Sequence, residues 1–183
     1  MPLSRIHCWF AVSLVLAACA AKNESREIPI VNASFEVKAD ADGGIPGWTL
    51  FQHAGVTAYV ASIDETMHAD GHASARVTRT REQVFGSLAQ TVQVAGLADK
   101  TIELSAMLKT QDVADGGWRL QLVQNSAGIP PATSRAFTGT SDFIPVSVRT
   151  RIAAATTEVE ISASLQGGGT AWIDAVHLRV VDP

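Results

Sequence analysis

Apolar and polar residues alternate with a period of two along most of this chain. The alternation is clearest in residues 101–109, 118–124, 157–165 and 171–181. In the first of these segments Ile102 and Leu104 fall on one side, and Glu103 and Ser105 fall on the other. Successive side chains of a β-strand point to opposite faces, so this period predicts strands with one face in a core.

Turn-forming residues separate these segments at short intervals. They are Asp42-Gly43-Gly44, Pro46-Gly47, Asp70-Gly71, Asp115-Gly116-Gly117, Pro130-Pro131 and Gly167-Gly168-Gly169. No helical stripe extends beyond two turns, and residues 64–69 are the best candidate for a single helical turn. Many short strands with regular turns predict one all-β domain, a β-sandwich of the jelly-roll kind. A hydrophobic content of 46% is enough for a packed core.

The first nineteen residues follow the order of an export signal. Arg5 precedes an apolar segment, residues 8–18, which is too short to span a bilayer as a helix. The segment ends in Leu16-Ala17-Ala18-Cys19, which resembles a bacterial lipobox. We therefore expect a lipoprotein signal peptide at 1–18, a lipidated tether at 19–27 and a folded domain at 28–183. The alternative is an ordinary secretory cut after Ala18 or Ala20.

The lipobox resemblance implies acylation of the Cys19 thiol by fatty acids such as palmitate, and hence a stable membrane anchor. No aspartate follows Cys19, so the resemblance to lipoproteins of Gram-negative cells implies the outer membrane, facing the periplasm or the cell surface. Cys8 and Cys19 are the only cysteines. The domain itself is therefore expected to have no disulfide, cysteine nucleophile or cysteine metal ligand.

Four stretches in order resemble the carbohydrate-binding modules of the family 4/9 type. They are residues 31–36 with 46–49, 70–77, 86–92 with 104–110, and 169–178. The resemblance implies a galactose-binding-like jelly roll with a carbohydrate ligand.

The same resemblance implies a structural calcium ion as cofactor. In the resembled modules the ion is held by carboxylates at the positions of Glu36 and Asp174 and by oxygens of the turn around Asp70. Calcium takes six to eight oxygen ligands, so carboxylates from distant segments suit it. The second carboxylate often found beside the closing aspartate is Ala175 here. The alternative is that Glu36 and Asp174 are exposed charges or partners of a lysine.

A ligand face follows partly from the resemblance and partly from the alternation. Phe85 occupies the place where the resembled modules often carry a cleft aromatic. Arg119, Gln121 and Glu160 point away from the core by the alternation, and we expect them to line the same cleft. Trp118 and Trp172 are expected in the core. Trp48 follows a Pro-Gly turn, and the sequence is compatible with either a core or a surface position for it. The alternative is an ordinary solvated strand face.

The charge distribution and the absence of catalytic motifs reduce the number of function classes that fit the sequence. The net charge of −4 is spread over interleaved acids and bases, which disfavours a nucleic-acid partner. The sequence has no Gly-x-Ser-x-Gly or His-Glu-x-x-His segment, and the glycine run 167–169 lies between two expected strands. We therefore expect a non-catalytic envelope lipoprotein that binds a glycan. A structural or protein-interaction module with a protein partner is the alternative, and an unrecognised hydrolase is the third.

Overall fold

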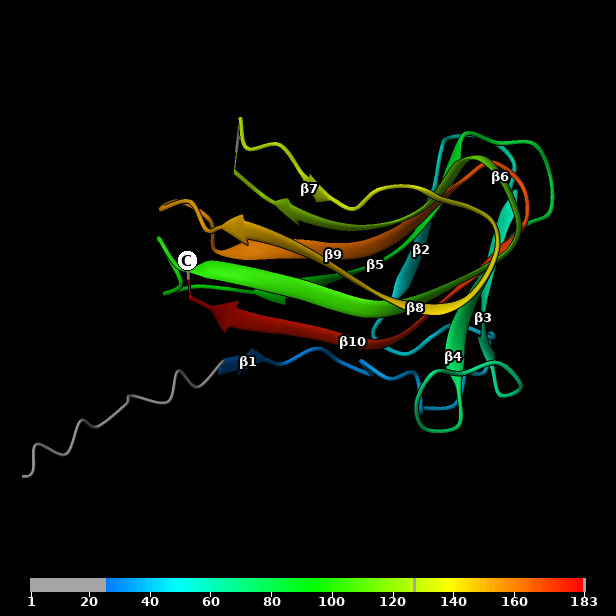
Figure 1. The fold of residues 1–183 in the computed structure, drawn as a ribbon, viewed down its shortest axis with the longest axis horizontal. Helices are drawn as coiled ribbons and strands as arrows, with labels where there is room; N and C mark the ends of the chain where they lie inside the picture. Colours follow the sequence, from blue (N-terminus) through cyan, green and yellow to red (C-terminus); the bar gives the residue numbers. More distant parts are fainter. Residues whose placement is uncertain (1–25, 127, 183) are drawn as a thin grey trace, which may run out of the picture.

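In the computed structural model of the chain, residues 26–126 and 128–182 are described, and they form ten β-strands joined by turns and loops (Figure 1). The strands are β1 (Arg26–Ile28), β2 (Thr49–Gln52), β3 (Tyr59–Asp64), β4 (Ser74–Arg79), β5 (Phe85–Gln93), β6 (Thr101–Gln124), β7 (Ala132–Thr133), β8 (Phe137–Arg151), β9 (Glu158–Gln166) and β10 (Thr170–Val181). The prediction of an all-β fold is confirmed. None of the described segments is a helix of the length and apolarity needed to span a membrane.

The strands form two layers that share β6 (Figure 1). In the first sheet, the N-terminal half of β6 lies between β8 and β10, and β10 continues to β4 and β3. In the second sheet, the C-terminal half of β6 pairs with β9, followed by β5 and β2, and β7 covers its other edge. All strand pairs are antiparallel, as expected for a jelly roll.

β6 passes from one sheet to the other at Gly116 and Gly117. The sequence predicts a turn here between two strands, and this prediction is wrong, because the strand continues through the glycines with shifts in its register to β8. Both glycines have positive φ angles, of 102° and 76°. A side chain on Gly117 would also meet the Ala136 Cβ and the Phe137 backbone. Glycine thus permits a bend where other residues would be strained.

The core lies between the two sheets and is built by the predicted alternation. Ile102, Leu104 and Leu108 face inward from the first half of β6, and Trp118, Leu120 and Leu122 from the second half. Trp118 has no exposed surface, which confirms its predicted place. Trp172 is also buried, but its neighbours in register are Arg76 and Lys109, so it packs on the outer side of the first sheet.

β1 begins at Arg26, within the segment assigned to the tether, and pairs with β10 in the first sheet. The start of β1 and the end of β10 lie at the same end of the sandwich (Figure 1). Cys19 and the signal segment lie outside the described residues. The predicted helical turn at 64–69 is absent: Asp64 ends β3, and residues 65–69 form a bend in which Asp64 accepts hydrogen bonds from Thr66 and Met67.

Candidate ligand-binding face

The outer side of the second sheet brings together the residues that the sequence assigns to a ligand. Paired residues of antiparallel strands share a face, so the register defines three transverse rows. The aromatic row holds Phe51, Ser87, Ser164 and Arg119, the middle row holds Thr49, Ala89, Ser162, Gln121 and Thr133, and the far row holds Thr91, Glu160 and Val123. Phe85 and Gln166 pair just beyond the aromatic row. We call this surface the binding face.

Aromatic rings gather at one end of the binding face. Phe51 is 52% exposed, although it is a large apolar residue. Phe85 lies on the neighbouring strand two residues from the partner of Phe51, a diagonal within reach of aromatic side chains. The Phe85 ring contacts His53 edge-on, with 6.1 Å between ring centroids. This end of the face therefore offers flat apolar surface to a ligand.

Small side chains form the middle of the binding face. Ser162 and Ser164 are only 2% and 5% exposed, although they point away from the core. Their register partners are Ala89 and Ser87 on β5, and Gln121 and Arg119 on β6. Phe51 and Phe85 lie further towards β2. Hydroxyl groups thus lie between an aromatic and a polar flank.

Charge divides the binding face along its length. The Arg119 guanidinium, at the aromatic end, donates a hydrogen bond of 2.9 Å to the Gln166 side-chain oxygen. Glu160 is four residues from Ser164, the partner of Arg119, and so lies roughly 13 Å further along the strand. Glu158, beyond it, accepts hydrogen bonds from Gln93 and Asn125.

All four residues predicted for the ligand, Phe85, Arg119, Gln121 and Glu160, lie on this one face. Their role in binding stays a prediction. The sequence did not single out Phe51 and His53, because the four-residue strand β2 is too short to show a period of its own. Trp48, which the sequence could place in the core or on the surface, is buried and packs on Phe35 with 5.2 Å between the ring centroids.

The three residues predicted for calcium meet around the turn at 69–73. Asp174 is fully buried, and its Oδ2 accepts hydrogen bonds from the Ala69 and Asp70 backbone N–H groups at 2.7 and 3.0 Å. Glu36 Oε1 accepts from the backbone N–H groups of His72 and Ala73, at 2.8 and 3.1 Å. Burial raises the pKa of Asp174, against the effect of these N–H groups. Asp70 contributes its backbone, and its side chain is exposed.

These contacts give Glu36 and Asp174 a role that needs no ion. Within the described residues, no three His, Cys, Asp or Glu side chains are arranged to hold a metal ion. The side chains as they lie therefore do not form a calcium cage, and calcium stays a prediction from the resemblance.

Glu36 has two possible roles, as a hydrogen-bond acceptor for the turn at 69–73 and as a calcium ligand. Melting curves distinguish them when the protein and Glu36→Gln are each measured with chelator and with added calcium. The hydrogen bonds predict that Glu36→Gln loses about 1–2 kcal/mol of stability, because a charged acceptor becomes neutral, and that the loss is the same with and without calcium. If calcium raises the Tm of the unmodified protein and leaves that of Glu36→Gln unchanged, an ion is bound.

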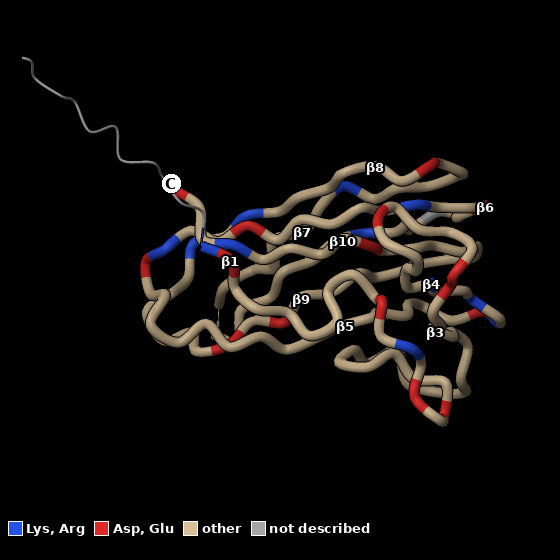
Figure 2. The backbone as a smooth tube through the Cα atoms, turned by 90° about the horizontal axis from the view of Figure 1, so that it is seen from below, with Lys and Arg blue, Asp and Glu red and all other residues tan. Residues whose placement is uncertain are grey.

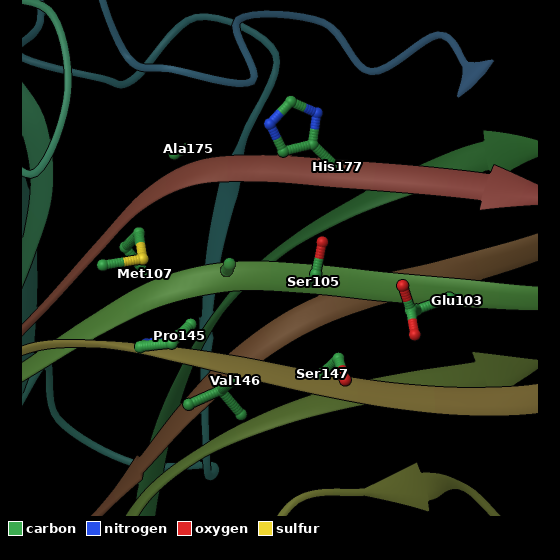
Figure 3. Close-up of a pocket in the computed structure, with 9 residues that line it drawn as sticks. Glu103, Ser105, Met107, Pro145, Val146, Ser147, Ala175 and His177 are labelled. Carbon is green, nitrogen blue, oxygen red and sulfur yellow. The ribbon is translucent and has the colours of Figure 1, made fainter. Parts of the chain in front are cut away.

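A second surface feature is a hollow of about 380 Å³ on the outer side of the first sheet (Figure 3). Its origin is a bulge in β10, where the register to β6 shifts between Asp174 and His177. Glu103, Ser105, Met107, Pro145, Ser147 and His177 line it, with no phenyl, phenol or indole ring. In Figure 3 the His177 ring lies beyond β10, away from the two serines; its Nδ1 is 3.6 Å from a Glu27 oxygen.

Lysine and arginine residues are interspersed with aspartate and glutamate over the described backbone (Figure 2). Most of the ion pairs lie in or beside the first sheet, such as Lys109–Asp142 at 2.9 Å and Arg151–Asp99 at 3.1 Å. Arg119 forms no ion pair with an aspartate or glutamate among the described side chains.

Comparison with known proteins shows similarity at the level of structure. No protein-family model matches the sequence, and no curated protein is similar to it. A Stig cyclase of Fischerella sp. TAU, solved in complex with an indole compound, superposes with a TM-score of 0.68, 16% identity and coverage of 87% of this chain and 99% of that chain.

Two carbohydrate-binding modules also superpose on the chain. One, from family 61, was solved with β-1,4-galactotriose and gives a TM-score of 0.60, with 15% identity over 86% of this chain and all of that chain. The other, from family 4, gives 0.58, with 17% identity over 84% of this chain and all of that chain. The predicted resemblance is confirmed for the fold: the chain has the jelly-roll fold of carbohydrate-binding modules.

Proposed function

We propose that this protein is a non-catalytic, glycan-binding domain, and that the binding face is its ligand site. The observation that carries the proposal is the combination of exposed Phe51 and half-buried Phe85 with exposed hydroxyl groups, those of Thr49, Thr91 and Thr133, on the same face. The face of a pyranose ring stacks on flat apolar rings, while its hydroxyls need polar partners beside them. The solved complex of the family 61 module with a galactotriose adds support by analogy.

The positions of the perturbed titratable groups favour binding over catalysis. Shifted pKa values often mark catalytic groups. Here they belong to Tyr59, Asp64 and Asp174, which lie off the binding face. Burial raises the pKa of Tyr59, and its hydroxyl donates to the Gln83 carbonyl oxygen. Asp64 and Asp174 hold turns. All three thus have structural partners.

A catalytic role is the second candidate, and the hollow on the first sheet favours it. Ser105 and His177 are paired in register there, and Glu103 lines the same space. A nucleophile and its base must come within hydrogen-bond reach. A rotation of the His177 side chain away from Glu27 would be needed for that, so binding is the better supported function.

Phe51→Ala and Phe85→Ala are each expected to weaken glycan binding by about 1–3 kcal/mol, the range for a base stacked on an aromatic side chain. The loss of folding stability should stay below about 1 kcal/mol for Phe51, because its ring is half exposed. Isothermal titration calorimetry and urea denaturation of the same samples measure the two effects.

Val60→Ala is the matched control, because Val60 is 48% exposed and lies on β3 of the other sheet. Its glycan affinity should equal that of the unmodified protein. A loss of about 3–5 kcal/mol of stability on Phe85→Ala would show that this ring serves the core instead.

We also propose that Cys19 carries the lipid that anchors the domain to the outer membrane. The lipobox resemblance supports this. β1, the first described strand, pairs with β10 in the first sheet. The chain thus enters the domain on the layer that does not carry the binding face, which leaves that face free for a ligand in the periplasm or outside the cell.

Cys19→Ser should move the protein from the detergent phase to the aqueous phase in a Triton X-114 partition of the expressing cells, because acyl chains supply the membrane affinity. Cys8→Ser is the control and should partition like the unmodified protein. Retention of the Cys19→Ser protein in the detergent phase would refute lipidation at this residue.

A further inference from the structure

The binding face carries one positively charged side chain in its three rows, and among the described side chains it forms no ion pair with a carboxylate. Arg119 is partly buried between the aromatic end and β7, and within the described residues its one side-chain hydrogen bond is to Gln166. A guanidinium has five N–H donors arranged to bind a planar acceptor such as a carboxylate. Most of these donors are therefore left for a ligand.

The surroundings of Arg119 favour an anion. Ser87 lies in its row and offers a partly exposed hydroxyl donor. Arg135 follows β7 along the same edge, and its guanidinium lies 4.5 Å from the Phe137 ring centroid. Partial burial lowers the effective dielectric around Arg119, which strengthens its attraction for an opposite charge.

The opposite end of the face disfavours an anion. Glu160 lies in the far row, and Glu158 is two residues beyond it on β9. A saccharide with a carboxylate on every unit would meet these two charges. One with a single carboxylate at the aromatic end would avoid them.

We infer that the ligand is an acidic oligosaccharide with one uronic acid, whose carboxylate binds Arg119 while its neighbouring neutral sugars extend over Ser162 towards Glu160. This inference rests on the proposed function, because it names the class of glycan that the binding face takes. The Arg119 guanidinium would form paired N–H bonds to the carboxylate oxygens, and Phe51 and Phe85 would stack on the adjoining ring.

Calorimetric titration with matched probe pairs tests the inference. Each pair is an oligosaccharide of three or four units with one uronic acid and the same compound with that carboxyl reduced to the primary alcohol, built on xylose, galactose and glucose backbones. We expect an acidic member to bind about tenfold to a hundredfold more tightly than its reduced counterpart, with an affinity that falls as salt is added.

Arg119→Gln should abolish the difference between the acidic and reduced members by lowering the affinity for the acidic member about tenfold to a hundredfold. Arg151→Gln removes an exposed arginine from β8 in the other sheet and should preserve the difference. Equal affinities within every pair, or an Arg119→Gln variant that still prefers the acid, would overturn the inference while glycan binding stands. If neither member of any pair binds, the uronic-acid inference is also wrong. The proposed glycan binding would then be tested separately, by whether the domain binds other glycans.

Discussion

Replacing Trp118 by alanine is expected to cost about 3–5 kcal/mol of folding free energy. Trp118 has no exposed surface and lies where β6 enters the second sheet, paired with Leu165 of β9 and Phe137 of β8. Its indole N–H donates to the Trp172 carbonyl oxygen at 3.1 Å. The substitution would leave a large cavity at this junction and one carbonyl without its partner.

Urea denaturation followed by circular dichroism measures this loss. Domains of this size are stable by about 5–15 kcal/mol, so the variant should lose a large part of its stability. Trp118→Phe keeps most of the ring volume and is expected to cost much less. A loss below about 1 kcal/mol on Trp118→Ala would show that the two sheets do not pack around this residue as described.

Asp64→Ala is expected to cost about 3 kcal/mol, because a buried charged acceptor with four hydrogen-bond donors is lost. Its Oδ1 accepts from the Thr66 backbone and hydroxyl and from the Met67 N–H. Its Oδ2 accepts from the Trp172 indole N–H at 2.9 Å, and Arg76 lies 3.6 Å away. The variant would leave a buried indole N–H unpaired.

Acid should reproduce part of this loss in the unmodified protein. Burial alone would raise the pKa of Asp64, but the hydrogen bonds from Thr66 and Trp172 and the charge of Arg76 outweigh it and lower the pKa from 3.8 to about 2. A lowered pKa in the folded state stabilises the protein above the unfolded value, and this contribution is lost as the pH falls towards the folded value. The shift corresponds to about 2 kcal/mol, lost between about pH 4 and pH 2.

Urea titrations at pH 6, 4, 3 and 2 on the protein and on Asp64→Asn measure this contribution. The amide cannot titrate, so the stability of Asp64→Asn should fall by about 2 kcal/mol less over this range. Parallel falls for the two proteins would contradict a lowered pKa at Asp64.

The alternation of residues predicted strands where one face is continuously apolar. β9 and β10 fit this pattern, because Val159, Ile161 and Leu178 recur on the buried side. β8 was not predicted, because Gly139 and Pro145 interrupt its pattern and much of it is exposed. The continuity of β6 was missed because two glycines usually end a strand, and here they bend one that both sheets hold in place.

The candidate site could be predicted only in part, because local alternation does not show how strands pair. Alternation tells which side of its own strand a residue takes, which was enough for Arg119, Gln121 and Glu160. It does not tell which strands become neighbours, so the row that joins Phe51 to Arg119 through β5 and β9 followed only from the register. The four-residue strand β2 is too short to show a period of its own.

A glycan array tests most directly whether the binding face binds a glycan. The domain from Arg26 onward and its Phe51→Ala/Phe85→Ala double variant are applied to the array side by side. We expect the domain to retain a defined set of saccharides in which acidic ones dominate, and the double variant to retain none while folding like the parent. An array on which nothing is retained, or on which the folded double variant retains the same saccharides, would contradict glycan binding at this face.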